Sequence, residues 1–199
     1  MLIRNLLTLL FVATLAGCVA GYTLVTPGIN SAEDLQVSAG RGWNLAPPLA
    51  SPGTPKGSQT WTQDGLLLNR LVIIPAIEDG ETVLTSQAED AALPAFRKDM
   101  LPNEIEELME SSLVKLWGEG NVTVGTANLR PQTYGDDRGL MFDIDVKLTD
   151  SPDYRGTVGA FVADEKLYTI WYIAAIPHYH DKHFASAESI IKSARVVRQ

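Results

Sequence analysis

The most regular alternation of apolar and polar residues lies in the second half of the chain. Every second residue from 140 to 148 is apolar, and most of the residues between them are polar. A period of two over this length predicts a β-strand with one buried and one wet face. Residues 121–130 and 156–163 are also predicted as strands. Residues 167–176 are apolar on both sides, which indicates a central or doubly covered strand.

Two segments have helical spacing instead. Pro102 suits the first turn of a helix, where its missing N–H costs nothing, and Gly118 is typical of a helix end. The apolar face between them consists of Ile105, Leu108, Met109, Leu113, Leu116 and Trp117. A second helix is predicted over residues 184–194, because its apolar residues share one face. That face consists of Ala187, Ile190, Ile191 and Ala194.

The region before the first helix predicts short strands separated by turns. A strand that ends near Trp43 is expected over residues 35–45. Two more are expected over residues 59–64 and 68–76, because Asp64-Gly65 marks a turn between two apolar runs.

Two stretches of this region have no apolar period. Residues 46–58 are rich in Pro, Gly and Ser, and they are predicted as a loop. Residues 77–100 are polar and irregular. Two interpretations of this second stretch stay open: a long surface loop beside a binding site, or an excursion without a role.

The order strands, helix, strands, helix predicts an α+β fold. Strands joined by short turns form an antiparallel sheet, and the two main helices must bury their apolar faces on it. The late apolar strand KLYTIWYIAAIP and the following helix with SIIKSARV resemble the ending of PsbP-like domains. This resemblance implies a non-catalytic binding or assembly domain, and it supplies no functional residues. We therefore expect one PsbP-like α+β domain over residues 35–199.

The lone cysteine of the chain ends an apolar leader. Arg4 gives a basic start, residues 6–15 are almost wholly apolar, and small residues precede Cys18. A basic start, a short apolar run and a small-residue cleavage site are typical of an export signal. The order Leu15-Ala16-Gly17-Cys18 resembles the lipobox of bacterial lipoproteins. The resemblance implies a diacylglycerol on the Cys18 thiol, cleavage before Cys18, and an amine open to N-acylation.

The leader sets the predicted domain organisation and location. Residues 1–17 are a lipoprotein signal peptide, and residues 18–34 are a lipidated tether. The alternative is a plain secretory peptide with an incidental cysteine. Val19 follows the cysteine, where an aspartate would favour inner-membrane retention. The sequence therefore predicts a palmitate-labelled, lipid-anchored protein of the cell envelope, held at the outer membrane and facing the periplasm.

Charge and cysteine content narrow the possible functions. The chain of 199 residues has a formal net charge of −8 and a sequence pI near 4.8. Nucleic-acid binding needs clustered Lys and Arg, so we expect no nucleic-acid partner. One cysteine forms no internal disulfide, so the core alone must hold the fold.

One cluster of potential metal ligands stands out. The segment PHYHDKHF contains all three histidines, His178, His180 and His183. Imidazole is a common zinc ligand, and residues two apart at a strand end face the same side. His178 and His180 could therefore bind one Zn²⁺, with His183 closing from the first turn of the helix. Asp181 could be a fourth ligand or a helix cap.

The same segment is similar to the His-x-His-x-Asp-His motif of metallo-β-lactamase-fold hydrolases, with departures. Asp181 stands one position early, Lys182 takes the place of the aspartate, and no later histidine completes the site. A metal-dependent hydrolase or metal-binding protein is therefore the alternative to a solvated polar loop, and no metal ligand is assigned.

Other candidates have simpler explanations. Asp143 and Asp145 share a strand face, as catalytic carboxylates do, but the wet face of an amphipathic strand explains them equally well. Asp136-Asp137 predicts a turn. The tryptophans are expected in the core, namely Trp43, Trp61, Trp117 and Trp171.

The sequence therefore predicts a binding or assembly module rather than an enzyme. No catalytic residues and no cofactor are assigned, apart from the covalent lipid on Cys18 and the zinc alternative. The expected partners are the membrane, through the lipid anchor, and an envelope protein or a small apolar ligand.

Overall fold

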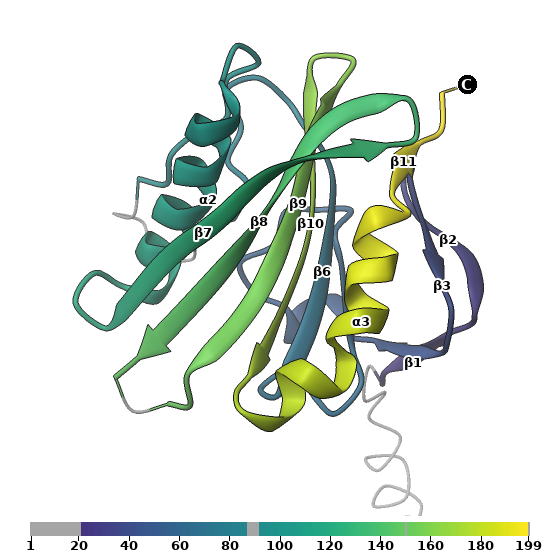
Figure 1. Cartoon of the computed structure of the whole chain (residues 1–199), viewed down its shortest axis with the longest axis vertical. Coiled ribbons are helices and arrows are strands. Elements are labelled where there is room, and N and C mark those ends of the chain that lie inside the picture. Colours follow the sequence, from purple (N-terminus) through teal and green to yellow (C-terminus); the bar gives the residue numbers. More distant parts are fainter. Residues whose placement is uncertain (1–20, 87–91, 150, 199) are drawn as a thin grey trace, which may run out of the picture.

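The computed structural model describes residues 21–86, 92–149 and 151–198 (Figure 1). The leader, Cys18 and Val19 lie outside the described residues. Within them, eight strands form one antiparallel sheet in the order β1-β4-β5-β6-β10-β9-β8-β7. The described strands of this sheet are β1 Thr23–Val25, β4 Trp43–Leu45, β5 Gln59–Thr62, β6 Asn69–Ile77, β7 Val122–Tyr134, β8 Asp137–Leu148, β9 Tyr154–Ala163 and β10 Lys166–Ala175.

The remaining elements cover this sheet. They are the helices α2 Pro102–Trp117 and α3 His178–Lys192, a short 3₁₀ turn η1 Pro48–Ala50, and the strands β2 Gly28–Ala32, β3 Leu35–Ala39 and β11 Arg195–Val196. These three strands form a second sheet in the order β11-β3-β2. The structure confirms an α+β fold with an antiparallel sheet and two helices. No helix of the described ranges is long and apolar enough to cross a bilayer.

The centre of the large sheet is the pair β6–β10. Trp171 lies opposite Val72, and Ile170 lies opposite Ile73. Every residue of β10 after Lys166 is buried, which confirms the prediction of a doubly covered strand. Neighbouring residues on these strands point to opposite faces, so each strand contributes to two separate cores.

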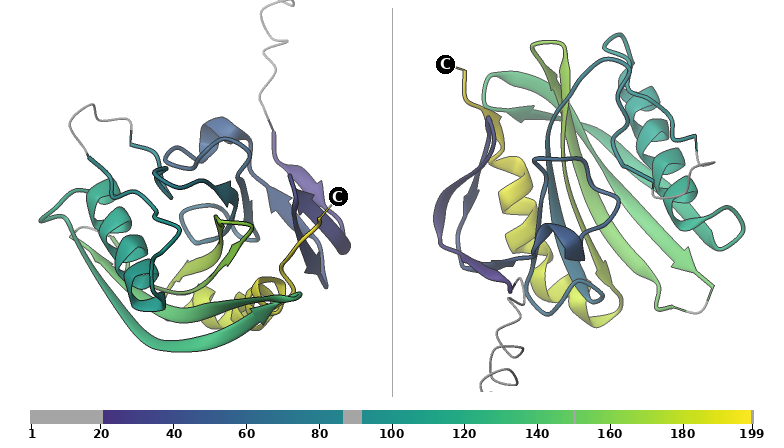
Figure 2. Two further views of the ribbon diagram at one scale, coloured as in Figure 1. Left: turned by 90° about the horizontal axis from the view of Figure 1, so that it is seen from above. Right: turned by 180° about the vertical axis from the view of Figure 1, so that it is seen from behind.

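The two helices pack on opposite faces of the large sheet (Figure 2). The core under α2 contains Val72, Ile74 and Trp171, whereas the core under α3 contains Ile73 and Ile170. The small sheet lies against the outer side of α3, where the Ser38 N–H donates to Ser193 Oγ at 2.8 Å. Helix α3 is therefore held between two sheets, whereas α2 shares its face of the large sheet with connecting segments that contribute Val83, Leu84 and Phe96 to the core.

Helix α2 confirms its sequence prediction. The Glu104 carboxylate accepts a hydrogen bond from the Leu101 N–H at 2.7 Å, which satisfies a donor at the helix start. Gly118 ends the helix with φ +92°, a conformation that favours glycine. Trp117, which we expected in the core, is only partly buried and reaches a cavity.

The structure differs from the sequence predictions at the start of the domain. Residues 35–45 form two strands rather than one, with β3 in the small sheet and β4 in the large sheet. The chain turns between them at residues 40–42, where two glycines flank Arg41. Strands β1 and β2 lie within residues 18–34, for which we expected a tether. The folded part therefore begins at least twelve residues earlier than predicted, at Thr23 rather than Leu35.

Candidate functional site

The three histidines lie on helix α3, not at a strand end. The prediction of a strand end is wrong because α3 begins at His178. An α-helix turns by about 100° per residue, so His178 and His180 point to nearly opposite sides. His178 is exposed, whereas His180 and His183 are buried. The arrangement that would let His178 and His180 share a metal is therefore absent.

Both ring nitrogens of His183 contact other side chains of the chain. Its Nε2 contacts Asp64 Oδ2, and its Nδ1 contacts the Arg41 guanidinium. Burial lowers the pKa of His183 below its usual value, although Asp64 opposes this effect. His180 instead stacks on Phe184, with ring centroids 4.9 Å apart.

Asp64 is the centre of these contacts. Besides His183, its carboxylate accepts hydrogen bonds from Lys182 Nζ at 2.7 Å and Asn69 Nδ2 at 2.9 Å. Burial alone would raise the pKa of Asp64, but the contacts with Lys182 and His183 lower it. We call Arg41, Asp64, Asn69, Lys182 and His183 the Asp64 cluster. It joins α3 to the turn between β5 and β6.

The described residues contain no group of three or more His, Cys, Asp or Glu side chains that could hold a metal ion. The predicted carboxylate pair is also separated into two ion pairs. Asp143 contacts Arg130 at 3.1 Å, and Asp145 contacts Arg155 at 2.8 Å. Asp145 is exposed, as expected for the wet face of a strand. The described residues therefore bring together neither the expected metal ligands nor an unpaired pair of carboxylates.

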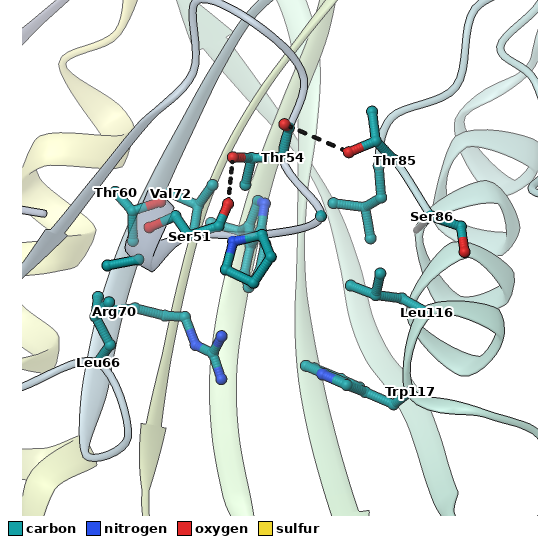
Figure 3. Close-up of a pocket in the computed structure, with 15 residues that line it drawn as sticks. Ser51, Thr54, Thr60, Leu66, Arg70, Val72, Thr85, Ser86, Leu116 and Trp117 are labelled. Carbon is teal, nitrogen blue, oxygen red and sulfur yellow. Dashed lines mark hydrogen bonds between the residues drawn. The ribbon is translucent and has the colours of Figure 1, made fainter. Parts of the chain in front are cut away.

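A cavity lies on the other side of the large sheet, under the end of α2. Its volume is about 380 Å³. We call it the Arg70 pocket, and its lining consists of residues 50–54, Thr60, Leu66, Arg70, Val72, residues 84–86, Leu116, Trp117 and Trp171. Figure 3 shows side chains from strands, from α2 and from the segments that connect them around the pocket.

Strand alternation places the sheet residues of the pocket. Arg70 and Val72 are two apart on β6, and they face α2 while Leu71 and Ile73 face α3. Trp171 lies opposite Val72 on β10, so both belong to the same side of the sheet.

The loop over residues 46–58 forms one wall of the pocket. Gly53 in this loop has φ +89°, and a Cβ there would lie 3.0 Å from Leu116 Cδ1. Its carbonyl accepts a hydrogen bond from the Thr85 N–H at 3.0 Å. Thr54 Oγ1 donates to the Ser51 carbonyl at 3.0 Å. A glycine therefore allows the loop to approach α2 closely enough to form this wall of the cavity.

Arg70 is the one charged residue among the described residues that line the pocket. Within the described part of the chain its guanidinium has no hydrogen bond and no ion pair. Burial lowers its pKa, opposed by the Tyr154 phenol. An arginine remains protonated in proteins, so the pocket carries a positive charge. In Figure 3 the guanidinium extends into the space between Leu66 and Trp117.

Three further polar atoms of the lining are buried without a partner. They are Ser51 Oγ, Thr60 Oγ1 and Trp171 Nε1. A buried polar group that makes no hydrogen bond costs about 1–3 kcal/mol. Buried polar groups in proteins are usually satisfied, so such a concentration at one cavity calls for an explanation.

The pocket is suited to binding rather than to acid–base chemistry. Its described lining contains no His, Asp, Glu, Cys, Lys or Tyr. General acid–base catalysis needs a group that titrates near the working pH, and arginine does not. Sequence reasoning did not identify Arg70 or this pocket, but residues 84–86 of the irregular stretch 77–100 line it, in agreement with the interpretation of that stretch as a loop beside a binding site. The available signal was a lone charged residue, Arg70, within the apolar run from Leu66 to Ile77.

The comparisons with known proteins concern the fold. No protein-family model matches the chain, and no curated protein matches it in sequence. Among solved structures, it is similar to the solution structure of cyanobacterial PsbP (CyanoP) from Synechocystis sp. PCC 6803. The TM-score is 0.58, and the identity is 12% over 92% of this chain and 96% of that chain.

A second solved structure is more distant. The crystal structure of LpqN of Mycobacterium tuberculosis, described as involved in cell envelope biogenesis, has a TM-score of 0.36 and 10% identity. The match covers 92% of this chain and 88% of that chain. This likeness is too weak to support an argument, whereas the likeness to PsbP confirms the PsbP-like fold and shows the fold alone.

Proposed function

We propose that this PsbP-like chain is a lipid-anchored protein of the bacterial cell envelope that binds a small molecule without transforming it. The observation that carries the binding role is the Arg70 pocket, a partly open cavity with mostly apolar walls and no titrating side chain in its described lining. Small-molecule sites are typically concave and apolar, with a few polar groups that fix the orientation of the ligand. The pocket has this composition.

A small ligand fits the site better than a protein partner does. Leu116, Trp117 and Leu66 are only partly exposed around the cavity, because the loop at Gly53 packs on α2. A protein partner would need a broad accessible patch of several hundred Å². The pocket offers a volume of about 380 Å³ instead, which suits a ligand at the small end of the usual range.

The proposed location rests on the leader. Cys18 ends the apolar run and follows Leu15-Ala16-Gly17. Each buried CH₂ of a lipid chain contributes about 0.8 kcal/mol, and stable anchoring takes two or more chains. A diacylglycerol on Cys18 would therefore hold the domain at a bilayer surface, with few residues between the anchor and Thr23.

The binding role is tested with two soluble probes, 4-phenylbutyrate and its neutral amide, in equilibrium dialysis against the purified full chain. At least one probe should bind. Leu66→Trp should weaken that binding by about tenfold, because Leu66 lines the pocket. Leu67→Trp is the matched control, since Leu67 is 78% exposed and outside the lining. If neither probe binds, or if both variants have the same effect, the proposed binding role is wrong.

The anchor is tested separately by growth with labelled palmitate. The wild-type chain should carry the label and stay with the membrane fraction, whereas Cys18→Ser should carry none. An unlabelled wild-type chain in the soluble fraction would contradict the anchor without affecting the pocket.

A further inference from the structure

We infer that the Arg70 pocket selects a monoanionic ligand, a carboxylate attached to an apolar body, through a direct contact with the Arg70 guanidinium. This inference rests on the proposed binding role and adds the chemical class of the ligand. Two observations support it. The Arg70 guanidinium has no partner among the described residues, and three buried polar atoms of the pocket lining make no hydrogen bond.

The positive charge of Arg70 favours an anionic ligand. Arg70 has no ion pair and no hydrogen bond within the described chain, and none of the described residues that line its pocket is a carboxylate. The Arg70 side chain is only partly exposed and has no partner, so a bound counter-charge in the pocket is favoured. The chain as a whole is strongly acidic, with a formal net charge of −8.

The number of charges favours a carboxylate over a phosphate monoester. A guanidinium binds a carboxylate through two parallel hydrogen bonds. A phosphate monoester carries a charge of about −1.5 to −2 near neutral pH. Arg70 is the one cation in the described lining, so it balances a single negative charge.

Three polar atoms of the lining that have no partner can each donate a hydrogen bond to such a ligand. Trp171 Nε1 is a donor, and the Ser51 and Thr60 hydroxyls can each donate one hydrogen bond. All three atoms lack a partner. They are buried on residues of the lining, so contact with a ligand requires these side chains to turn toward the cavity. This donor-rich set complements a carboxylate, which only accepts.

The apolar residues of the lining favour a ligand whose remaining part is also apolar. Leu66, Val72, Leu116 and Trp117 present carbon surface around the guanidinium (Figure 3). An apolar or aromatic body would gain about 25 cal/mol for each Å² of carbon surface that it buries there. A free inorganic anion would leave these walls uncovered.

The test compares 4-phenylbutyrate with its neutral amide on the purified full chain by equilibrium dialysis. We expect the carboxylate to bind about ten- to hundredfold more tightly than the amide, as is typical of a charged hydrogen bond. Arg70→Gln should remove this preference, and Arg70→Lys should keep part of it. Lys56→Gln is the control for a nearby exposed cation outside the lining, and it should leave the preference unchanged.

The outcomes separate the inference from the proposed function. Equal binding of the two probes, still weakened by Leu66→Trp, would overturn the anion selectivity and leave the binding role intact. Binding of neither probe would overturn both. Displacement of 4-phenylbutyrate by an equal concentration of inorganic phosphate would show a site that recognises charge alone, which also contradicts the inference. Circular dichroism confirms that each variant is folded.

Discussion

The Asp64 cluster and the Arg70 pocket lie on the two sides of the large sheet, at the same turn between β5 and β6. In the Asp64 cluster the central carboxylate contacts His183, Lys182 and Asn69. In the Arg70 pocket the guanidinium has no partner among the described residues, and neither do three neighbouring polar atoms. The sequence directed attention to the histidines, whereas the structure places the unsatisfied chemistry on the opposite side.

The difference indicates what each region does. Polar groups that satisfy one another stabilise the arrangement in which they are found, and they leave little binding capacity for a ligand. Polar groups without partners destabilise the free protein and gain most from a ligand. We therefore expect substitutions in the Asp64 cluster to change stability, and substitutions in the Arg70 pocket to change binding.

The largest expected effect follows from Asp64→Ala. The substitution leaves Lys182, His183 and Asn69 without their shared acceptor. Breaking such a network should lower the free energy of unfolding by about 2–3 kcal/mol, measured by urea denaturation. Asp145→Ala is the control, because Asp145 forms an exposed ion pair with Arg155. The control should cost less than about 1 kcal/mol. Equal costs would mean that the Asp64 cluster has no special structural role.

A smaller effect is expected from Gly53→Ala, which tests how the pocket is enclosed. The added Cβ would adopt a strained φ and lie 3.0 Å from Leu116 Cδ1. Gly65→Ala is the matched control, since Gly65 also has a positive φ but nothing within 4 Å of its Cβ. Gly53→Ala should cost about 1 kcal/mol more than the control, because strain and crowding add. A cost no greater than the control would show that the loop does not depend on this contact.

The Asp64 cluster should also make stability depend on pH. Burial lowers the pKa of His183 in the folded state, opposed by Asp64 and supported by Arg41 and Lys182. The unfolded chain then binds the proton more readily, so the free energy of unfolding falls as the pH drops below about 6.5. The Asp64 pKa is lowered from 3.8, so its own contribution is lost only at lower pH.

The measurement compares denaturation curves at about pH 7.5 and about pH 5.5 for wild type and His183→Gln. Wild type should lose more stability on acidification than the variant, because the other two histidines are common to both. If wild type and the variant lose the same amount, His183 does not titrate as its burial predicts.

The difference between the two regions also shows which features of the structure the sequence could predict. Strand β8 and helix α2 follow from periodicity, which is a local property of the chain. The start of α3 was missed because His and Tyr are modest helix formers and the apolar face begins late. The contact between Asp64 and His183 joins residues 119 positions apart, so no local pattern contains it. The Arg70 pocket is likewise assembled from six separate segments of the chain.

The smallest expected change in stability comes from Arg70→Met. This substitution is the sharpest test of the difference between the Asp64 cluster and the Arg70 pocket. Methionine keeps an unbranched side chain of similar reach and removes an uncompensated charge from the pocket. The free energy of unfolding should stay unchanged or rise by up to about 1 kcal/mol, because an unpaired charge is removed and no hydrogen bond is lost. Arg130→Met is the control, since Arg130 pairs with Asp143 at 3.1 Å, and it should lower stability by up to about 1 kcal/mol. Opposite signs in urea denaturation would support the distinction between a paired arginine that stabilises the fold and an unpaired one that serves a ligand. A clear loss of stability in Arg70→Met would instead make Arg70 a structural residue, and the pocket would lose the feature that sets its proposed selectivity.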